Sequence, residues 1–486
     1  MGGVSPFVLT CCLLAAGAVQ AAAQGPAMGV VEARHLLART GFGARIEEIE
    51  AYSRLSREDG VERLLGGVRT VARTPAPDSV NVWTPPYQIR QMSSEDRKLF
   101  MREQAERALE LKSWWLSEML GTDSPLTERM TLFWHNHFTS SLQKVRSSRL
   151  MYRQNSLLRK HALGSYAELL HAVSKDPAML VYLDSATSRR GQPNENFARE
   201  AMELFTLGEG HYGERDIKEA ARAFTGWSID RESGDFMWRA FAHDDGAKTV
   251  LGRSGNFRGE DVIAILLDQS ATAGFVVGKL WREFVSPQPD PVALERIAAS
   301  FRRSGYQIRT ALLELLLSDA FWAPETRGAL IKSPVDLVIG TLRQFDIAIA
   351  DPLPFALLLR NLGQDLFSPP NVKGWPGGNA WITSQTLLAR KQFLERLMRV
   401  DDTRMALGRA EQAMDPQKPM ARRAMRAMID IQFSAGDWVR PFRDPGSQVS
   451  MQSALLATAP AGDNSRAAQG TELLRALISD PVYQLK

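Results

Sequence analysis

The chain has 486 residues, of which 44% are hydrophobic and 23% are charged, a composition that is ordinary for a soluble globular protein. At this length it can form two or three domain-sized units around a sizeable core. The formal net charge of +4 is too small to indicate nucleic-acid binding by itself. The sequence also has neither zinc-finger spacing nor a long basic run, so these classes of nucleic-acid-binding protein are not indicated.

The N-terminus has the pattern of an export signal. Residues 7–20 form an apolar segment that is too short to span a membrane, and AAAQ at 21–24 resembles a signal-peptidase cleavage site. We therefore expect residues 1–23 to be removed and the rest of the chain to be periplasmic or secreted, although no Lys or Arg precedes the apolar segment. Cys11 and Cys12 both lie in this segment, so the exported protein is expected to have no disulfide, thiolate ligand or cysteine nucleophile.

Helical periodicity and helix-start signals dominate the remaining sequence. Ser124-Pro125, Asp176-Pro177 and Ser333-Pro334 each place a capping residue before a proline, which is typical of the first turn of a helix. Other helices are expected near residues 30–40, 45–66, 95–120, 146–173, 194–207, 215–225, 259–270, 272–284, 291–303, 307–318, 354–361, 383–398, 403–411, 420–433 and 469–478.

The clearest strand signal lies at residues 235–253, where apolar residues alternate and Asp244-Asp245-Gly246 has the chemistry of a turn. The predicted fold is therefore mainly α, a multi-helix globular bundle with a small β-hairpin insertion near 235–253. We expect residues 24–486 to form one helical unit. A subdivision into a helical half at 24–230, the insertion at 231–258 and a second helical half at 259–486 is the alternative.

Two histidines in the stretch FWHNHF are the first candidate site. In a helix that begins at Pro125, His137 continues an apolar face, whereas His135 lies about 200° away around the axis. Two histidines so placed cannot bind one metal ion while the helix continues, and they converge only in an extended segment. The structural interpretation is that His137 is a core histidine that donates to a carbonyl, while His135 is exposed or bridging.

The second candidate is a polar stripe in the helix expected at 194–207. Asn196, Arg199, Glu200 and Glu203 share a narrow face, and apolar residues cover most of the remaining circumference. Such a helix is expected to be buried, with its polar face toward a cavity or partner groups. Two carboxylates one turn apart require a cation, a shared proton or an arginine between them. The stripe therefore predicts either a site or a structural salt-bridge network with Arg199, Arg222 or Lys218.

The third candidate is the segment His243-Asp244-Asp245-Gly246-Ala247-Lys248. The turn explains Asp245 and Gly246 completely, but it does not explain His243 beside Asp244, nor Lys248. A histidine next to a carboxylate can act as a metal-ligand pair or an acid–base pair. Turn and solubility chemistry is the alternative for each residue here.

Several long motifs occur together in one order, and they give the sequence a resemblance. FWHNHF, NENFAREAMELFTLGEG, GERDIKEAARAFTGW, HDDGAKTVLG, IKSPVDLVIGTLRQ and NVKGWPGGNAWITSQTLLAR resemble the bacterial family called domain of unknown function 1800. The resemblance covers essentially the whole mature chain. One departure is Ala201, where the family pattern typically has Leu.

The resemblance implies an exported, mostly helical protein with no established activity. It also implies a partner, because genes of the family often lie beside those of another exported family, domain of unknown function 1501. The motif residues that it carries to this sequence are His135, Asn136, His137, Asn194, Asn196, Arg199, Glu200, Glu203, Arg222, Trp227, His243, Asp244, Lys248, Trp375 and Asn379. Burying such polar groups without partners costs about 1–3 kcal/mol each, so a shared polar pocket is the economical explanation.

Three functions follow as predictions. The first is an exported enzyme that binds a divalent metal, or uses metal-free acid–base chemistry, on an envelope substrate such as a polysaccharide. The second is a non-catalytic assembly or binding partner of a protein of the 1501 type, and the third is a redox protein with non-covalent haem or a non-haem metal. The predicted catalytic residues are Glu200, Glu203, His243 and Arg199. The predicted metal ligands are His135, His137, Glu200 and Asp244.

Overall fold

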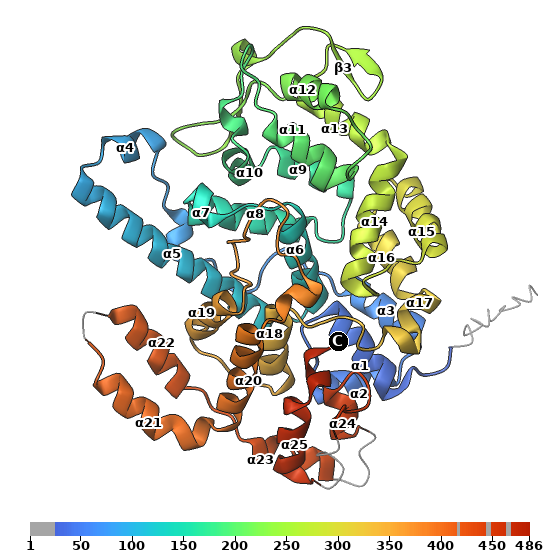
Figure 1. Cartoon of the computed structure of the whole chain (residues 1–486), viewed down its shortest axis with the longest axis vertical. Coiled ribbons are helices and arrows are strands. Elements are labelled where there is room, and N and C mark those ends of the chain that lie inside the picture. Colours follow the sequence, from blue (N-terminus) through green and yellow to red (C-terminus); the bar gives the residue numbers. More distant parts are fainter. Residues whose placement is uncertain (1–24, 416–417, 444–448, 463–467) are drawn as a thin grey trace, which may run out of the picture.

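The computed structural model describes residues 25–415, 418–443, 449–462 and 468–486 (Figure 1). The predicted export signal at 1–23, with Cys11 and Cys12, lies outside the described residues. Within the described ranges the mainly α fold with a small β component is confirmed.

Helices make up most of the described chain. Before the strands they are α1 (Gly29–Thr40), α2 (Ile46–Ser53), α3 (Arg57–Gly66), α4 (Pro86–Gln91), α5 (Ser94–Gly121), α6 (Pro125–His137), α7 (Leu142–Val145), α8 (Ser148–Lys160), α9 (Tyr166–Ser174), α10 (Pro177–Tyr182), α11 (Asn196–Glu200), the π-helix η3 (Ala201–Thr206) and α12 (Glu214–Ala223). After the strands they are α13 (Gly259–Asp268), α14 (Ser270–Phe284), α15 (Pro291–Arg303), α16 (Ile308–Leu316), α17 (Asp319–Trp322), α18 (Pro334–Gln344), α19 (Leu353–Asn361), α20 (Ser384–Met398), α21 (Val400–Gln412), α22 (Pro419–Ile429), α23 (Ala435–Trp438), α24 (Met451–Leu455) and α25 (Gly470–Ser479). Short 3₁₀ turns are η1 (Asp78–Asn81), η2 (Ser185–Thr187), η4 (Ala240–Ala242), η5 (Pro324–Thr326), η6 (Gly378–Trp381), η7 (Arg440–Arg443) and η9 (Pro481–Gln484).

Local capping explains where several of these helices begin. The side chains of Asp176 and Ser333 accept hydrogen bonds from backbone amides two or three residues into α10 and α18, and a proline follows each cap, as predicted. The predicted helices at 45–66 and 146–173 are each divided. Ser56 caps the new helix α3, and Ser165 caps α9.

The β component consists of two small antiparallel sheets rather than one hairpin. Strand β1 (Trp227–Ile229) pairs with β2 (Phe236–Trp238), and β3 (Lys248–Val250) pairs with β4 (Arg253–Gly255). The expected pairing across Asp244-Asp245-Gly246 was therefore wrong, although the strands lie in the predicted region. Leu251 and Gly252 both have positive φ, which matches the right-handed twist of a tight hairpin turn and joins β3 to β4.

Helix α6 lies between two hydrophobic clusters at the centre of the molecule (Figure 1). Its residues Leu126, Met130 and Trp134 belong to one cluster, which α8, α9 and α13–α17 also build. Leu132 belongs to the other cluster, which α5, α18–α20 and α25 build. Both sides of α6 are thus buried, so its polar residues emerge where the two clusters meet. The subdivision of the chain at 231–258 stays a prediction.

The end of α1 lies directly against α18. Gly43 has φ +85, and a Cβ there would lie 2.8 Å from the carbonyl oxygen of Gly340. Only glycine tolerates both this backbone conformation and this approach. The contact places the loop after α1 against the middle of α18, and the marked C-terminus lies near both helices (Figure 1).

Of the helices in the described ranges, none by itself has the length and apolar character of a membrane span, and α13 with α14 passes that test only as a pair bent by 77°.

Candidate functional site

A cleft of about 440 Å³ opens where α6, α14 and three loops meet. Helix α6 supplies one wall, α14 supplies a second wall, and the NVKGWPGG loop supplies a third. The residues that line the cleft are Arg129, Leu132, Phe133, Asn136, His137, Lys279, Arg282, Glu283, Pro287, Leu330, Ile331, Ser333, Asp336, Gln364, Lys373, Trp375, Pro376, Gly377, Gly378, Trp381 and Lys486. Several sequence motifs therefore meet at one cavity, which is the default place to look for a ligand site.

Asn136 attaches the NVKGWPGG loop to α6. Its side-chain oxygen accepts a hydrogen bond from the backbone amide of Trp375 at 2.7 Å. Gly374 has φ +82, and a Cβ at this position would lie 2.2 Å from the Asn136 side-chain oxygen. The glycine therefore allows the loop to approach the helix, and the asparagine holds it there. This contact explains Asn136 and Trp375 of the predicted motif residues.

His137 is a buried histidine that donates to a carbonyl, as the structural interpretation predicted. Its Nε2 lies 3.1 Å from the carbonyl oxygen of Phe205, which also accepts a hydrogen bond from the Tyr166 hydroxyl. A carbonyl only accepts, so Nε2 carries the proton and Nδ1 offers a lone pair. Burial, and after it the charge of Lys279, hold the pKa of His137 well below its usual value. The imidazole is therefore neutral at physiological pH.

The carbonyl that binds His137 lies in the last turn of a π-helix, where backbone carbonyls have no partner within the helix. The helix expected over 194–207 begins as α11 and continues as η3. In this wider helix Leu207 and Gly208 donate to Met202, and the carbonyls of Leu204 and Phe205 bond side chains instead. π-Helical turns of this kind are frequent at functional sites.

Lys279 of α14 lines the cleft beside His137. Its Nζ lies 3.1 Å from His137 Nδ1 and donates to the carbonyl of Leu204 at 2.9 Å. Burial, and after it the nearby charge of Arg282, lower the pKa of Lys279 to about 8. About one tenth of this amine is thus unprotonated at pH 7, and the amine faces an open cavity. An amine in that state can accept a proton or act as a nucleophile.

An ion-pair network forms the inner end of the cleft. Arg129 bonds Asp336 and lies 3.2 Å from Glu283, while Lys486 Nζ lies 2.9 Å from the second oxygen of Asp336. Burial raises the pKa of Asp336, but Arg129 and Lys486 outweigh it and hold the pKa of this carboxyl far below its usual range. Asp336 is therefore permanently charged and fully engaged, which suits a structural role.

His135 lies on the opposite side of α6 from His137. Its ring packs against Trp115, Phe367 and Trp375, with centroids 5.4–5.7 Å apart. The side chain is 1% exposed, and its Nε2 has no hydrogen-bond partner among the described residues. Burial lowers its pKa to about 3. The expectation of an exposed or bridging His135 was wrong, because both faces of α6 are covered.

The predicted metal ligands are not brought together. Helix α6 continues through His137, so His135 and His137 diverge as the helical geometry requires. Asp244 is held by Arg222, and Glu200 lies on α11. In the ranges that the structure covers, no three His, Cys, Asp or Glu side chains form a group that could hold a metal ion.

The polar stripe of the second candidate forms ion pairs at a half-exposed surface. Arg199 bonds Glu214 at 2.8 Å and Glu195 at 3.4 Å, which is the salt-bridge alternative. Glu203 accepts from the Tyr212 hydroxyl at 3.0 Å and lies 3.7 Å from Lys373 of the cleft loop. The stripe therefore reaches the edge of the cleft through Lys373.

Glu200 is the carboxylic acid of this stripe whose pKa is raised above its usual value. Burial raises its pKa first, and the neighbouring charge of Glu203 raises it further. Glu200 is half-buried and does not line the cleft. It is thus a titratable group near the predicted site, but it is separate from Lys279 and His137.

The third candidate is a hydrogen-bonded network that leaves one buried nitrogen, His243 Nε2, without a hydrogen-bond partner among the described residues. Arg222 binds Asp244 through two nitrogens, at 2.8 and 3.1 Å, and this pair lowers the pKa of Asp244 to about 2. His243 Nδ1 lies 2.9 Å from the carbonyl of Thr225, and Lys248 donates to the carbonyl of Asp244 at 2.5 Å. These contacts hold the loop before β3 against α12. The arrangement agrees with the alternative in which these residues stabilise a turn.

Sequence reasoning missed Lys279, Arg282, Arg129 and Lys486. Lys279 offered one signal, a single cation inside the apolar run FVVGKLW. Long side chains usually extend such a charge to solvent, so the run alone predicts an ordinary surface lysine. Only the approach of α6 and η3 reveals that this amine is confined.

Residues 35–485 match the profile of the family described as "Protein of unknown function (DUF1800)". The chain has no match among curated proteins or among solved structures.

Proposed function

We propose that this chain, which belongs to the family "Protein of unknown function (DUF1800)", is a metal-free acid–base enzyme that acts on an anionic substrate in the cleft. The observation that carries the proposal is the Lys279 amine. It has a pKa of about 8, contacts His137 and lines a cavity of about 440 Å³. Displaced pKa values in clefts are characteristic of catalytic acids and bases.

The charges of the cleft support an anionic substrate. Arg129 and Lys486 are engaged by Asp336 and Glu283, so these four groups largely neutralise one another. Arg282 is exposed at the cleft and forms no ion pair within the described chain. Together with Lys279 it leaves the cleft positive, and a concave positive surface raises the local concentration of anions.

The ion pairing of the two carboxylates in the cleft favours proton abstraction over glycoside hydrolysis. Hydrolysis by the usual mechanisms needs two carboxyl groups, one of them protonated. The two carboxylates of this cleft, Asp336 and Glu283, are both paired with Arg129, and Asp336 cannot hold a proton at physiological pH. A neutral amine beside a cation is better suited to an elimination next to a substrate carboxylate.

In the proposed step the substrate is an acidic polysaccharide of the envelope or its surroundings. Arg282 binds the uronate carboxylate, and the Lys279 amine takes the proton from the adjacent carbon. The electron pair left on that carbon forms a C=C bond as the bond to the leaving glycosidic oxygen breaks. The Lys279 ammonium then returns its proton to that oxygen. His137 is a positioning residue, because it holds the amine through Nδ1.

The test is an elimination assay on the purified protein. Polygalacturonate and alginate serve as anionic substrates and dextran as a neutral one, and the unsaturated product is followed by its ultraviolet absorbance. We expect product from a uronate polymer only. Lys279→Met should lower kcat by about 10²–10⁴-fold, the usual contribution of a general base.

Lys218→Met is the matched control, because it removes an exposed lysine from α12. It should leave kcat and KM unchanged. An elimination activity that survives Lys279→Met would contradict the assignment of the base. Absence of product from every uronate polymer, together with no binding of uronate oligosaccharides by calorimetry, would contradict the substrate class.

Export of the chain, a partner of the 1501 type and a redox centre stay predictions. The envelope location of the substrate rests on the export prediction alone, whereas the anionic chemistry rests on the cleft.

A further inference from the structure

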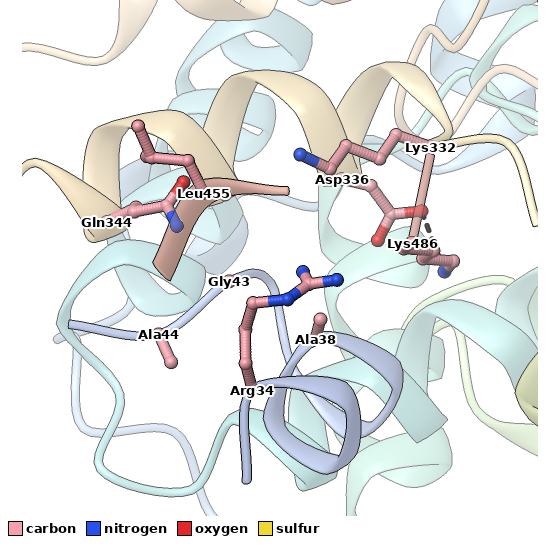
Figure 2. Close-up of a pocket in the computed structure, with 10 residues that line it drawn as sticks. Arg34, Ala38, Gly43, Ala44, Lys332, Asp336, Gln344, Leu455 and Lys486 are labelled. Atoms are coloured by element: carbon pink, nitrogen blue, oxygen red, sulfur yellow. Dashed lines mark ion pairs between the residues drawn. The ribbon is translucent and has the colours of Figure 1, made fainter. Parts of the chain in front are cut away.

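A second, smaller cavity lies between α1, α18 and the C-terminal residue. Its volume is about 20 Å³, and it is lined by Arg34, Ala38, Gly43, Ala44, Lys332, Asp336, Gly340, Gln344, Leu455 and Lys486 (Figure 2). It shares Asp336 and Lys486 with the large cleft, but its remaining lining is separate. The proposed enzyme chemistry does not use this cavity.

Arg34 is a buried cation with no partner. Its side chain comes from α1, and the residue is 6% exposed. Within the described residues its guanidinium group forms no hydrogen bond or ion pair. Figure 2 shows its guanidinium group directed into the cavity, on the side opposite Lys332. A buried charge without a counter-charge is costly, so the arrangement needs an explanation.

Lys332 is a second cation that points into the same cavity (Figure 2). Its Nζ lies 3.9 Å from the centroid of the Tyr483 ring, which is a favourable cation–π contact, but it makes no hydrogen bond or ion pair in the described chain. Burial, and after it the charge of Arg34, lower the pKa of Lys332 to about 7. The two cations therefore destabilise each other's charged forms.

The carboxylate beside them does not balance this charge. Asp336 already binds Arg129 and Lys486, and Arg390, another buried cation, also acts on the Lys332 amine. Glu32 is occupied by Arg57 and Arg327. The region thus holds more positive than negative groups, with Arg34 buried and Lys332 partly exposed.

We propose that this cavity binds a small monovalent anion of the size of chloride, held by Arg34 and Lys332. A volume of about 20 Å³ exceeds the roughly 10–15 Å³ that one water needs, so the cavity has room for a single atomic anion. The anion would connect α1 with Lys332, which lies two residues before α18, and these two elements are far apart in the sequence.

The first test is thermal unfolding of the full chain in chloride at constant ionic strength, with gluconate as the balancing anion. Chloride should raise Tm in a saturable way by about 1–2 °C at ten times its dissociation constant. Sulfate in place of chloride should give no saturable rise. An equal rise with sulfate would overturn the site, because it would report a general salt effect.

Two substitutions on the same helix sharpen this result. Arg34→Gln should abolish the chloride-dependent rise, and in gluconate it should be at least as stable as the parent because an unbalanced charge is gone. Arg39→Gln is the control. It removes a buried arginine that donates to the carbonyls of Phe284 and Val285, so it should lower Tm and keep the chloride-dependent rise. A rise that persists in Arg34→Gln would overturn the proposal.

The second test does not depend on a variant that folds. Crystals of the unaltered protein grown in bromide should show an anomalous peak between the Arg34 guanidinium and Lys332 Nζ. Density at this place without anomalous signal would identify an ordered water and overturn the proposal.

Discussion

Two regions of the molecule are built around an arginine–aspartate pair, and they use it differently. Near the strands, Arg222 holds Asp244, and the neighbouring polar groups of Thr225 and Lys248 bond within the same loop. In the cleft, Arg129 holds Asp336 in a comparable way. However, the cleft also contains the Lys279 amine, which has a lowered pKa and faces open space.

The difference teaches how to interpret polar residues in sequence motifs. Both regions bury charged groups, and each contains a motif that the sequence marked as a candidate, FWHNHF in the cleft and His243-Asp244 near the strands. In the strand region the charged groups bond one another and the loop backbone, although His243 Nε2 has no hydrogen-bond partner among the described residues. In the cleft a comparable set of ion pairs leaves the Lys279 amine facing open space, where it can contact a substrate. A buried polar cluster is therefore not sufficient evidence of chemistry, whereas a displaced pKa beside a cavity is more specific.

The largest expected effect concerns the stability of the two networks. Arg129→Met should lower the free energy of unfolding by about 3–5 kcal/mol, because it removes a buried cation that binds both Asp336 and Glu283 and leaves Asp336 with Lys486 alone to balance it. Arg222→Met should lower it by only about 1–2 kcal/mol, because its partners are partly exposed and water replaces the lost bonds. Urea unfolding followed by circular dichroism measures both.

Arg231→Met is the control for this pair, since Arg231 is exposed. It should change stability by less than about 0.5 kcal/mol. Equal losses in the Arg129 and Arg222 variants would show that burial does not distinguish the two networks.

The second prediction is the pH dependence of the proposed activity. Lys279 accepts a proton only as the free amine, and its pKa is lowered to about 8. The rate should therefore rise about tenfold per pH unit below 8 and level off above it. Because the pKa is lowered from 10.5 in the folded state, the contribution of Lys279 to the free energy of unfolding should also rise between pH 8 and 10.5. A rate that rises with a midpoint near pH 4–5 would instead indicate a carboxylate base.

The third prediction concerns the loop that closes the cleft. Asn136→Ala removes the bond to the Trp375 amide, at a cost of about 1–2 kcal/mol. We expect KM to rise several-fold with a smaller change in kcat, and the Trp375 amide to exchange faster with deuterium. Asn379→Ala, an exposed position in the same loop, should leave both unchanged. An unaltered KM in Asn136→Ala would mean that the loop does not contact substrate.

The smallest expected effect is that of a chelator. His135 and His137 diverge from α6, and the proposed chemistry needs only the amine and its positioning groups. Dialysis against EDTA should leave kcat unchanged. Activity that is lost on dialysis and restored by a divalent cation would favour the metal-dependent form of the enzyme prediction.

Much of the local structure could be predicted from sequence because its causes are local. Caps such as Asp176 and Ser333 and the apolar periodicity of the helices lie within a few residues. The carbonyl bond of His137 was also predictable, since a histidine on an apolar face needs a partner. The pairing of the strands could not be predicted, because one short segment contains two possible turns, Asp244-Asp245-Gly246 and Leu251-Gly252.

The sequence by itself determined the mainly α fold, the positions of many helix ends, the family and the divergence of His135 from His137. Only the tertiary structure decided which polar groups face a cavity and can contact a ligand there. Lys279 meets His137 across 142 residues, and Arg129 meets Asp336 across 207. Such contacts depend on how helices pack rather than on local propensity. No sequence pattern therefore predicts the confined Lys279 amine or the cavity at Arg34.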